Sequence, residues 1–177
     1  METAVSMSSA RPDALLARGV LYVHSAPRAL CSHVEWAAGG ALGRGVSFAW
    51  RPQPVLPQTQ RAVFVWDGEP GTGAAIASAL RGWEHLRFEV TEDASAGGDG
   101  GRWMHTPELG IHFAQTDSVG NLVVPEDRIR AALAHAGNAF EIHRELRLAL
   151  GEAWDEELEP FRHAHEDAPV VWLHRAG

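Results

Sequence analysis

The chain has 177 residues, of which 45% are hydrophobic, with a formal net charge of −8 and a single cysteine. This length and apolar content are sufficient for one domain with a substantial core. The negative charge disfavours nucleic acids and anionic membranes as partners, and no apolar stretch approaches the length of a membrane span. A single cysteine excludes an internal disulfide and is typical of a reducing compartment, so we expect a cytoplasmic protein.

Residues 1–17 are rich in Ser and Ala, and we expect them to form a disordered tail. The remainder, 18–177, is predicted to be a single α+β domain. It divides at a Gly-rich segment, 94–101, which has the composition of a mobile loop. The two parts are therefore 18–94 and 101–177.

The first part alternates between strand and helix patterns. Residues 19–24 and 61–66 are nearly continuous apolar runs, which are typical of strands buried on both faces, whereas 46–51 and 86–91 alternate between apolar and polar residues, as edge strands do. Helices are predicted at 27–42 and 72–83. This βαββαβ order predicts a ferredoxin-like split βαβ core. We expect an antiparallel sheet in the order fourth, first, third, second strand, with both helices on one face.

Three aromatic residues on the predicted central strands, Tyr22, Phe64 and Trp66, are expected to point to the face opposite those helices. An exposed aromatic patch of that size is unusual on a monomer. We therefore expect the helical stretch 139–159, or a second copy of the chain in a homodimer, to cover this face.

The second part is predicted to extend the core with a β-hairpin, helices and a final strand. The patterns indicate strands at 102–106, 110–116 and 122–124, a helix at 126–137, a longer helix at 139–159 that Gly151 could interrupt, and a last apolar strand at 170–173.

One segment has partial similarity to RNA-recognition domains, which share this element order. Leu21-Tyr22-Val23 resembles their shorter signature, but Ala62 stands where the longer signature needs an aromatic residue. The acidic composition also opposes RNA, so an RNA-binding domain is the least favoured interpretation.

The best candidate for ligand binding is the Gly-rich turn 68–74 between a strand and a helix. The N–H groups of Gly71, Thr72 and Gly73 could bind a small anion at the helix N-terminus, with Arg44 or Arg102 offsetting the negative field. The spacing matches neither a Walker A loop nor a dinucleotide fingerprint. A plain turn in which Thr72 or Glu69 caps the helix is the simpler interpretation.

The ten histidines suggest metal binding, but no group of them has zinc-site spacing, so we expect no metal and no cofactor. His105, Glu108 and His112 flank a predicted turn and are a candidate acid/base cluster. The simpler interpretation is that these are surface or hydrogen-bonded side chains.

Six motifs together resemble the actinobacterial family known as domain of unknown function 3145. They are Leu21-Tyr-Val-His-Ser-Ala26, Cys31-Ser-His-Val-Glu-Trp36, Gly68-Glu-Pro-Gly-Thr-Gly73, His105-Thr-Pro-Glu-Leu-Gly110, Val124-Pro-Glu-Asp-Arg128 and Trp154-Asp-Glu-Glu-Leu-Glu-Pro-Phe161. The resemblance covers about residues 18–175. It implies a role near acyl-carrier or coenzyme A-linked metabolism and assigns no catalytic or binding residue.

Two classes of function follow from the sequence. We favour a binding or regulatory protein without chemistry of its own, which recognises another protein or a small anionic ligand. The acidic segment 154–161 is the alternative contact surface for a protein partner. The other class is a small enzyme acting on an acyl thioester or another anionic molecule, with Glu108 and a neighbouring His as acid and base.

Overall fold

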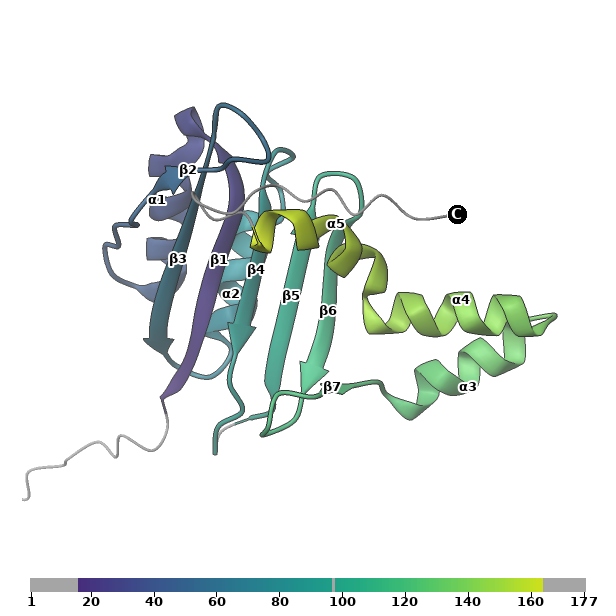
Figure 1. The fold of residues 1–177 in the computed structure, drawn as a ribbon. Helices are drawn as coiled ribbons and strands as arrows, with labels where there is room; N and C mark the ends of the chain where they lie inside the picture. Colours follow the sequence, from purple (N-terminus) through teal and green to yellow (C-terminus); the bar gives the residue numbers. More distant parts are fainter. Residues whose placement is uncertain (1–15, 97, 164–177) are drawn as a thin grey trace, which may run out of the picture.

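The computed structural model describes residues 16–96 and 98–163. Most of the predicted N-terminal tail and all of the predicted strand 170–173 lie outside these residues. The described chain is a mixed α+β structure with a seven-stranded antiparallel sheet and five α-helices (Figure 1). None of these helices is long and apolar enough to cross a membrane.

The strands follow the order β2-β3-β1-β4-β5-β6-β7 across the sheet. Their bounds are β1 Ala17–Pro27, β2 Arg51–Pro52, β3 Thr59–Gly68, β4 Arg87–Glu92, β5 Gly100–Thr106, β6 Gly110–Thr116 and β7 Leu122–Val123. Strand β1 therefore pairs with β3 and β4, as the apolar runs predicted, and β5 and β6 add to the outer side of β4.

Helices α1 (Cys31–Leu42) and α2 (Thr72–Leu80) cover one face of the sheet (Figure 1). A short 3₁₀ turn, Arg28–Leu30, precedes α1. The helix α1 ends at Gly43, which has the left-handed conformation. Alternate residues of β1, β3 and β4 point towards these helices and form the core. Its largest fully buried side chains include Leu21, Trp66, Ile76, Leu80 and Phe88.

The prediction of a strand at 46–51 is wrong, because in this region only Arg51 and Pro52 join the sheet. A carboxylate on α1 competes for the preceding residues. Glu35 Oε1 accepts hydrogen bonds from the backbone N–H of Phe48 at 2.7 Å and from Nε1 of Trp50 at 3.0 Å. The segment is therefore bound to the helix through one backbone N–H that a strand ladder could have used and through one indole side chain.

The prediction that three aromatic residues share the face opposite the helices is also wrong. The register pairs Tyr22 with Val63, and Leu21 with Phe64, so Tyr22 and Phe64 point to opposite faces. Trp66 is only 1% exposed in the core beneath the helices. Its ring passes over Gly19, where an added Cβ would lie 2.4 Å from the ring.

Two helices of the second part form a hairpin that extends beyond the sheet: α3 (Glu126–His135) and α4 (Ala139–Leu150) (Figure 1). Gly151, with φ of 76°, separates α4 from α5 (Glu152–Arg162). Of these three helices, α5 alone crosses the sheet, on the face opposite α1 and α2 (Figure 1). We call this the open face. The prediction that 139–159 covers it therefore holds for the last third of that stretch alone.

Candidate ligand-binding site on the open face of the sheet

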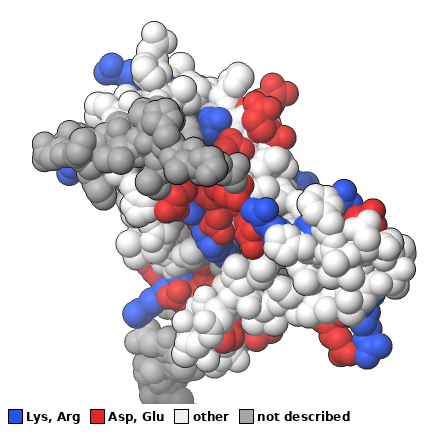
Figure 2. All heavy atoms as spheres, turned by 45° about the vertical axis from the view of Figure 1, so that its right-hand side comes forward, with Lys and Arg blue, Asp and Glu red and all other residues white. Residues whose placement is uncertain are grey.

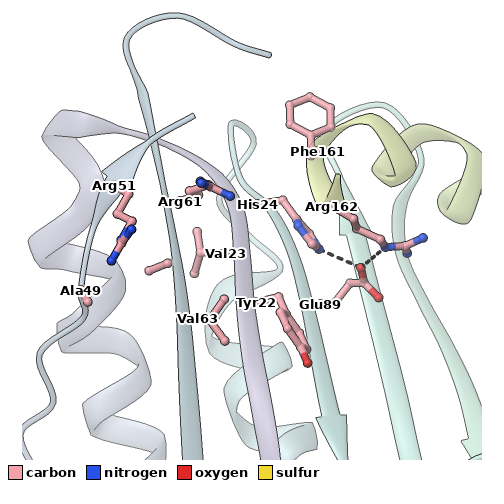
Figure 3. Close-up of a pocket in the computed structure, with 11 residues that line it drawn as sticks. Tyr22, Val23, His24, Ala49, Arg51, Arg61, Val63, Glu89, Phe161 and Arg162 are labelled. Carbon is pink, nitrogen blue, oxygen red and sulfur yellow. Dashed lines mark hydrogen bonds and ion pairs between the residues drawn. The ribbon is translucent and has the colours of Figure 1, made fainter. Parts of the chain in front are cut away.

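A pocket of about 690 Å³ lies on the open face between β1, β3 and the end of α5. This volume is within the usual range for small-molecule sites, about 300–1,000 Å³. Figure 3 shows Arg51 and Arg61 on one side of the pocket and Glu89 and Arg162 on the other. The remaining lining residues are Tyr22, Val23, His24, Ala49, Ala62, Val63 and Phe161.

Arg51 and Arg61 are direct partners in the β2–β3 ladder. Like charges directly opposite each other destabilise an antiparallel pair. Neither guanidinium forms an ion pair with a described residue, and the buried Nε of Arg61 has no hydrogen-bond partner among them. Two cations therefore face one pocket, and no carboxylate of residues 16–96 and 98–163 forms an ion pair with either.

The opposite wall is a network built on Glu89 of β4, which is 5% exposed. Its Oε1 lies 2.7 Å from His24 Nε2 and accepts a hydrogen bond of 2.6 Å from Arg162 Nε. Its Oε2 accepts one of 2.7 Å from Nη2 of Arg102. Asp155 of α5 also accepts from both arginines. These contacts bind α5 to the sheet, and Figure 2 shows acidic and basic side chains intermixed in the middle of the molecule.

Both carboxylate oxygens of Glu89 have partners within this network. Burial alone would raise the pKa of its carboxyl group, but hydrogen bonds from His24 and Arg162, with the charges of His24 and Arg102, hold that pKa well below its ordinary value. The carboxylate is consequently ionised and neutralised by its neighbours. It therefore does not compensate the charge of Arg51 and Arg61.

The Gly-rich turn predicted as an anion site already holds an anion of the chain itself. The N–H groups of Gly71 and Gly73 each donate to the Glu92 carboxylate at 2.7 Å, and the N–H of Thr72 donates to the carbonyl of Glu69. The N-terminus of α2 therefore binds a carboxylate, as its positive dipole end favours, and β4 supplies it. An external anion at this turn would have to displace Glu92.

The two arginines suggested for that turn also have other partners. Arg44 pairs with Asp67 at 3.1 Å, and Arg102 pairs with Glu89 and Asp155. Neither is therefore left to bind an anion at the Gly-rich turn.

The predicted cluster of His105, Glu108 and His112 does not converge. Across β5 and β6, His105 pairs with Ile111, and Met104 pairs with His112, so the two histidines point to opposite faces. His105 stacks on Phe88 in the core, and its Nδ1 lies 3.0 Å from the carbonyl of Leu86. Glu108 is exposed in the turn.

His112 is buried against the Trp154 ring of α5. Burial lowers the pKa of both His105 and His112, which favours neutral rings. Among residues 16–96 and 98–163, no group of three or more His, Cys, Asp or Glu side chains could hold a metal ion.

Sequence reasoning missed the residues of this pocket, although one signal was present. Arg51 ends the predicted second strand and Arg61 begins the third, so a hairpin between those strands would place them opposite each other. The meeting of His24 with Glu89 depends on a register shift in β1 between Val23 and Ser25. No pattern of residues in the sequence predicts that register shift.

Comparison with known proteins gives one match. No curated protein and no solved structure matches the chain. A family model described as a protein of unknown function (DUF3145) matches residues 20–175. The chain belongs to this family.

Proposed function

We propose that the protein binds a small anionic molecule, a carboxylate or a phosphate, in the open-face pocket, without chemistry of its own. One observation carries the proposal. Arg51 and Arg61 lie opposite each other and face the pocket, and neither has an ion pair in the described part of the chain. An anion between them would convert a repulsive pair into two charge-assisted contacts.

The chemistry of arginine supports a carboxylate or phosphate ligand. The guanidinium group presents its N–H donors in a planar fork that matches these two groups bidentately. The buried Nε of Arg61 has no partner among the described residues, so one such donor is already oriented and desolvated. Ordering it for a ligand therefore costs less than ordering an exposed side chain.

The net charge of −8 would repel an anionic ligand, but the charges around the pocket differ from those of the whole protein. Among the described residues that line the pocket, Glu89 is the one carboxylate, and its arginine and histidine partners neutralise it. The local field is therefore positive although the whole protein is acidic. The turn at Gly71, Thr72 and Gly73 is the less favoured anion site, because Glu92 occupies its N–H groups.

A second candidate is an enzyme acting on an acyl thioester or another anionic substrate. It is favoured by the contact of 2.7 Å between His24 and Glu89 in the wall of the pocket. A histidine oriented by a carboxylate through one ring nitrogen can act as a base through the other. In this case His24→Gln would abolish turnover of an acyl-coenzyme A substrate.

We also infer two properties of the whole protein. The order of β1, α1, β2, β3, α2 and β4 supports a ferredoxin-like split βαβ unit. Its second strand is reduced to two residues. The single cysteine, Cys31, supports a cytoplasmic location.

The test is isothermal titration calorimetry of the full chain with inorganic phosphate and with acetate. We expect saturable binding that Arg61→Gln weakens about tenfold or more, in line with one charged hydrogen bond of about 1.5–3 kcal/mol. Arg81→Gln is the control, because Arg81 is exposed at the end of α2 and forms no ion pair with a described residue. Equal affinities for the wild type and both variants would contradict the proposal.

A further inference from the structure

An apolar strip continues from the pocket along the open face. It consists of two directly paired sets on β1 and β3, Val20 with Val65 and Tyr22 with Val63. Val63 is 60% exposed and Val65 is 72% exposed, while Val20 and Tyr22 are half-buried. Tyr22 and Val63 also line the pocket, so the strip and the arginine pair share one surface.

We propose that the anion bound by Arg51 and Arg61 carries an extended alkyl or acyl chain, and that this chain lies on the apolar strip. The inference rests on the proposed function and adds the class of ligand. A long-chain carboxylate and an alkyl phosphate share the required chemistry, since each has an anionic head and an unbranched apolar tail.

The position of the strip along β3 supports this arrangement. Arg61 lies at one end, and Val63 and Val65 follow at the spacing of successive residues on one face of a strand. A ligand whose head contacts Arg61 therefore has its chain over Val63 and then over Val65. From residue 61 to residue 65 the strand extends about 14 Å, at about 3.4 Å per residue.

The far end of the strip is charged. The next pair on this face is Arg18 with Asp67, and the Asp67 carboxylate is held by Arg44. An apolar chain gains nothing by extending over this pair, because it would desolvate charged groups. The strip therefore also sets an upper length for the part of the chain that contributes to affinity.

The first test is a series of unbranched carboxylates from acetate to hexadecanoate, titrated below their micelle concentrations. Full burial of a methylene is worth about 0.8 kcal/mol, or about fourfold in affinity. Because the strip covers one side of the chain, we expect about half that free energy, or about twofold per methylene, until the chain reaches about 14 Å. A matching series of alkyl phosphates, titrated in the same way, shows whether the pocket binds a carboxylate or a phosphate head group more tightly.

The matched variants are Val63→Thr and Val65→Thr, which keep the side-chain shape and strand propensity but add a hydroxyl. We expect both to reduce the gain in affinity per methylene. Val65 does not line the pocket, so Val65→Thr should leave acetate binding unchanged, whereas Arg61→Gln should weaken every member of the series by the same factor. If acetate binds but affinity does not rise with chain length, the inference is overturned and the proposed function stands. If acetate and phosphate do not bind at all, both are overturned.

A second copy of the chain is the competing occupant of the strip. Sedimentation velocity of the wild type and of Val65→Thr separates the two. A dimer that Val65→Thr dissociates would overturn the inference by assigning the strip to self-association. An unchanged sedimentation coefficient, together with a reduced gain per methylene, supports the ligand chain.

Discussion

Arg51 and Arg61 face each other across the β2–β3 pair, and in the described part of the chain neither meets a carboxylate. The strand that brings them together is only two residues long. A buried network formed by Glu89 and its partners closes the other side of the same pocket. Glu89 and Asp155 thus pair with Arg102 and Arg162, and neither carboxylate pairs with Arg51 or Arg61.

The first prediction concerns the stability of the unliganded protein. Arg51→Gln removes a like-charge contact, so the free energy of unfolding should rise by about 0.2–1 kcal/mol. Urea denaturation at low ionic strength measures the change, and added salt should reduce it. Arg81→Gln serves as the control. A loss of stability in Arg51→Gln would mean that the guanidinium has a stabilising partner.

The second prediction concerns Glu89. Glu89→Gln removes the buried one of the two carboxylates that pair with Arg102 and Arg162, and breaking a buried ion pair by removing one partner costs about 3–5 kcal/mol. We expect a correspondingly lower midpoint in chemical denaturation. Glu108→Gln, at an exposed position of the β5–β6 turn, should change stability by less than about 0.5 kcal/mol. Similar effects of the two substitutions would refute a structural role for the network.

The third prediction concerns pH. Burial lowers the folded-state pKa of His105 and His112, so below the ordinary value of about 6.5 the unfolded chain binds more protons than the folded one. Stability should therefore fall as the pH decreases from about 6.5 towards the lowered values. His112→Phe keeps an aromatic ring against Trp154 and should make the free energy of unfolding less dependent on pH between about 7 and 5. An identical dependence in wild type and variant would be the contrary result.

Glu89 affects the free energy of unfolding in a lower pH range than the histidines do. Its folded-state pKa is lowered, so its contribution is complete above the ordinary glutamate value of about 4.3 and is lost as the pH falls below that value. In an acid titration of stability, the loss from the histidines should therefore begin at about pH 6.5 and the loss from Glu89 below about pH 4.3.

Much of the first part of the fold could be predicted because burial leaves a clear pattern. The apolar runs of β1 and β3 indicated central strands, and both helices were found within a few residues of their predicted bounds. The strand at 46–51 failed because the competing Glu35 carboxylate comes from another element. Contacts of this kind depend on tertiary structure, which a local pattern does not contain.

The candidate site was harder to predict for a similar reason. The N–H groups of the Gly-rich turn do bind a carboxylate, but sequence reasoning could not identify Glu92 as its source. The histidine cluster was separated by strand alternation, which places His105 and His112 on opposite faces. Choosing between shared and opposed faces requires the register of the hairpin.

The fourth prediction tests the turn directly. Glu92→Ala should cost about 0.5–2 kcal/mol of stability, since the first turn of α2 loses the carboxylate that accepts its N–H groups. In the wild type, phosphate should leave the amide signals of Gly71 and Gly73 unchanged. In Glu92→Ala those signals should shift with phosphate, because the N–H groups are then unpaired. Shifts in the wild type would instead restore this turn as a ligand site.

The central claim is that an anion binds between Arg51 and Arg61. The most direct measurement is a nuclear magnetic resonance titration of the full chain with phosphate, following the Nε–H signals of the arginine side chains. We predict that the signals of Arg51 and Arg61 shift together along one saturable curve, while that of Arg81 does not move. Arg51 and Arg61 signals that stay unchanged at saturating phosphate, or that shift no more than the signal of Arg81, would contradict the account.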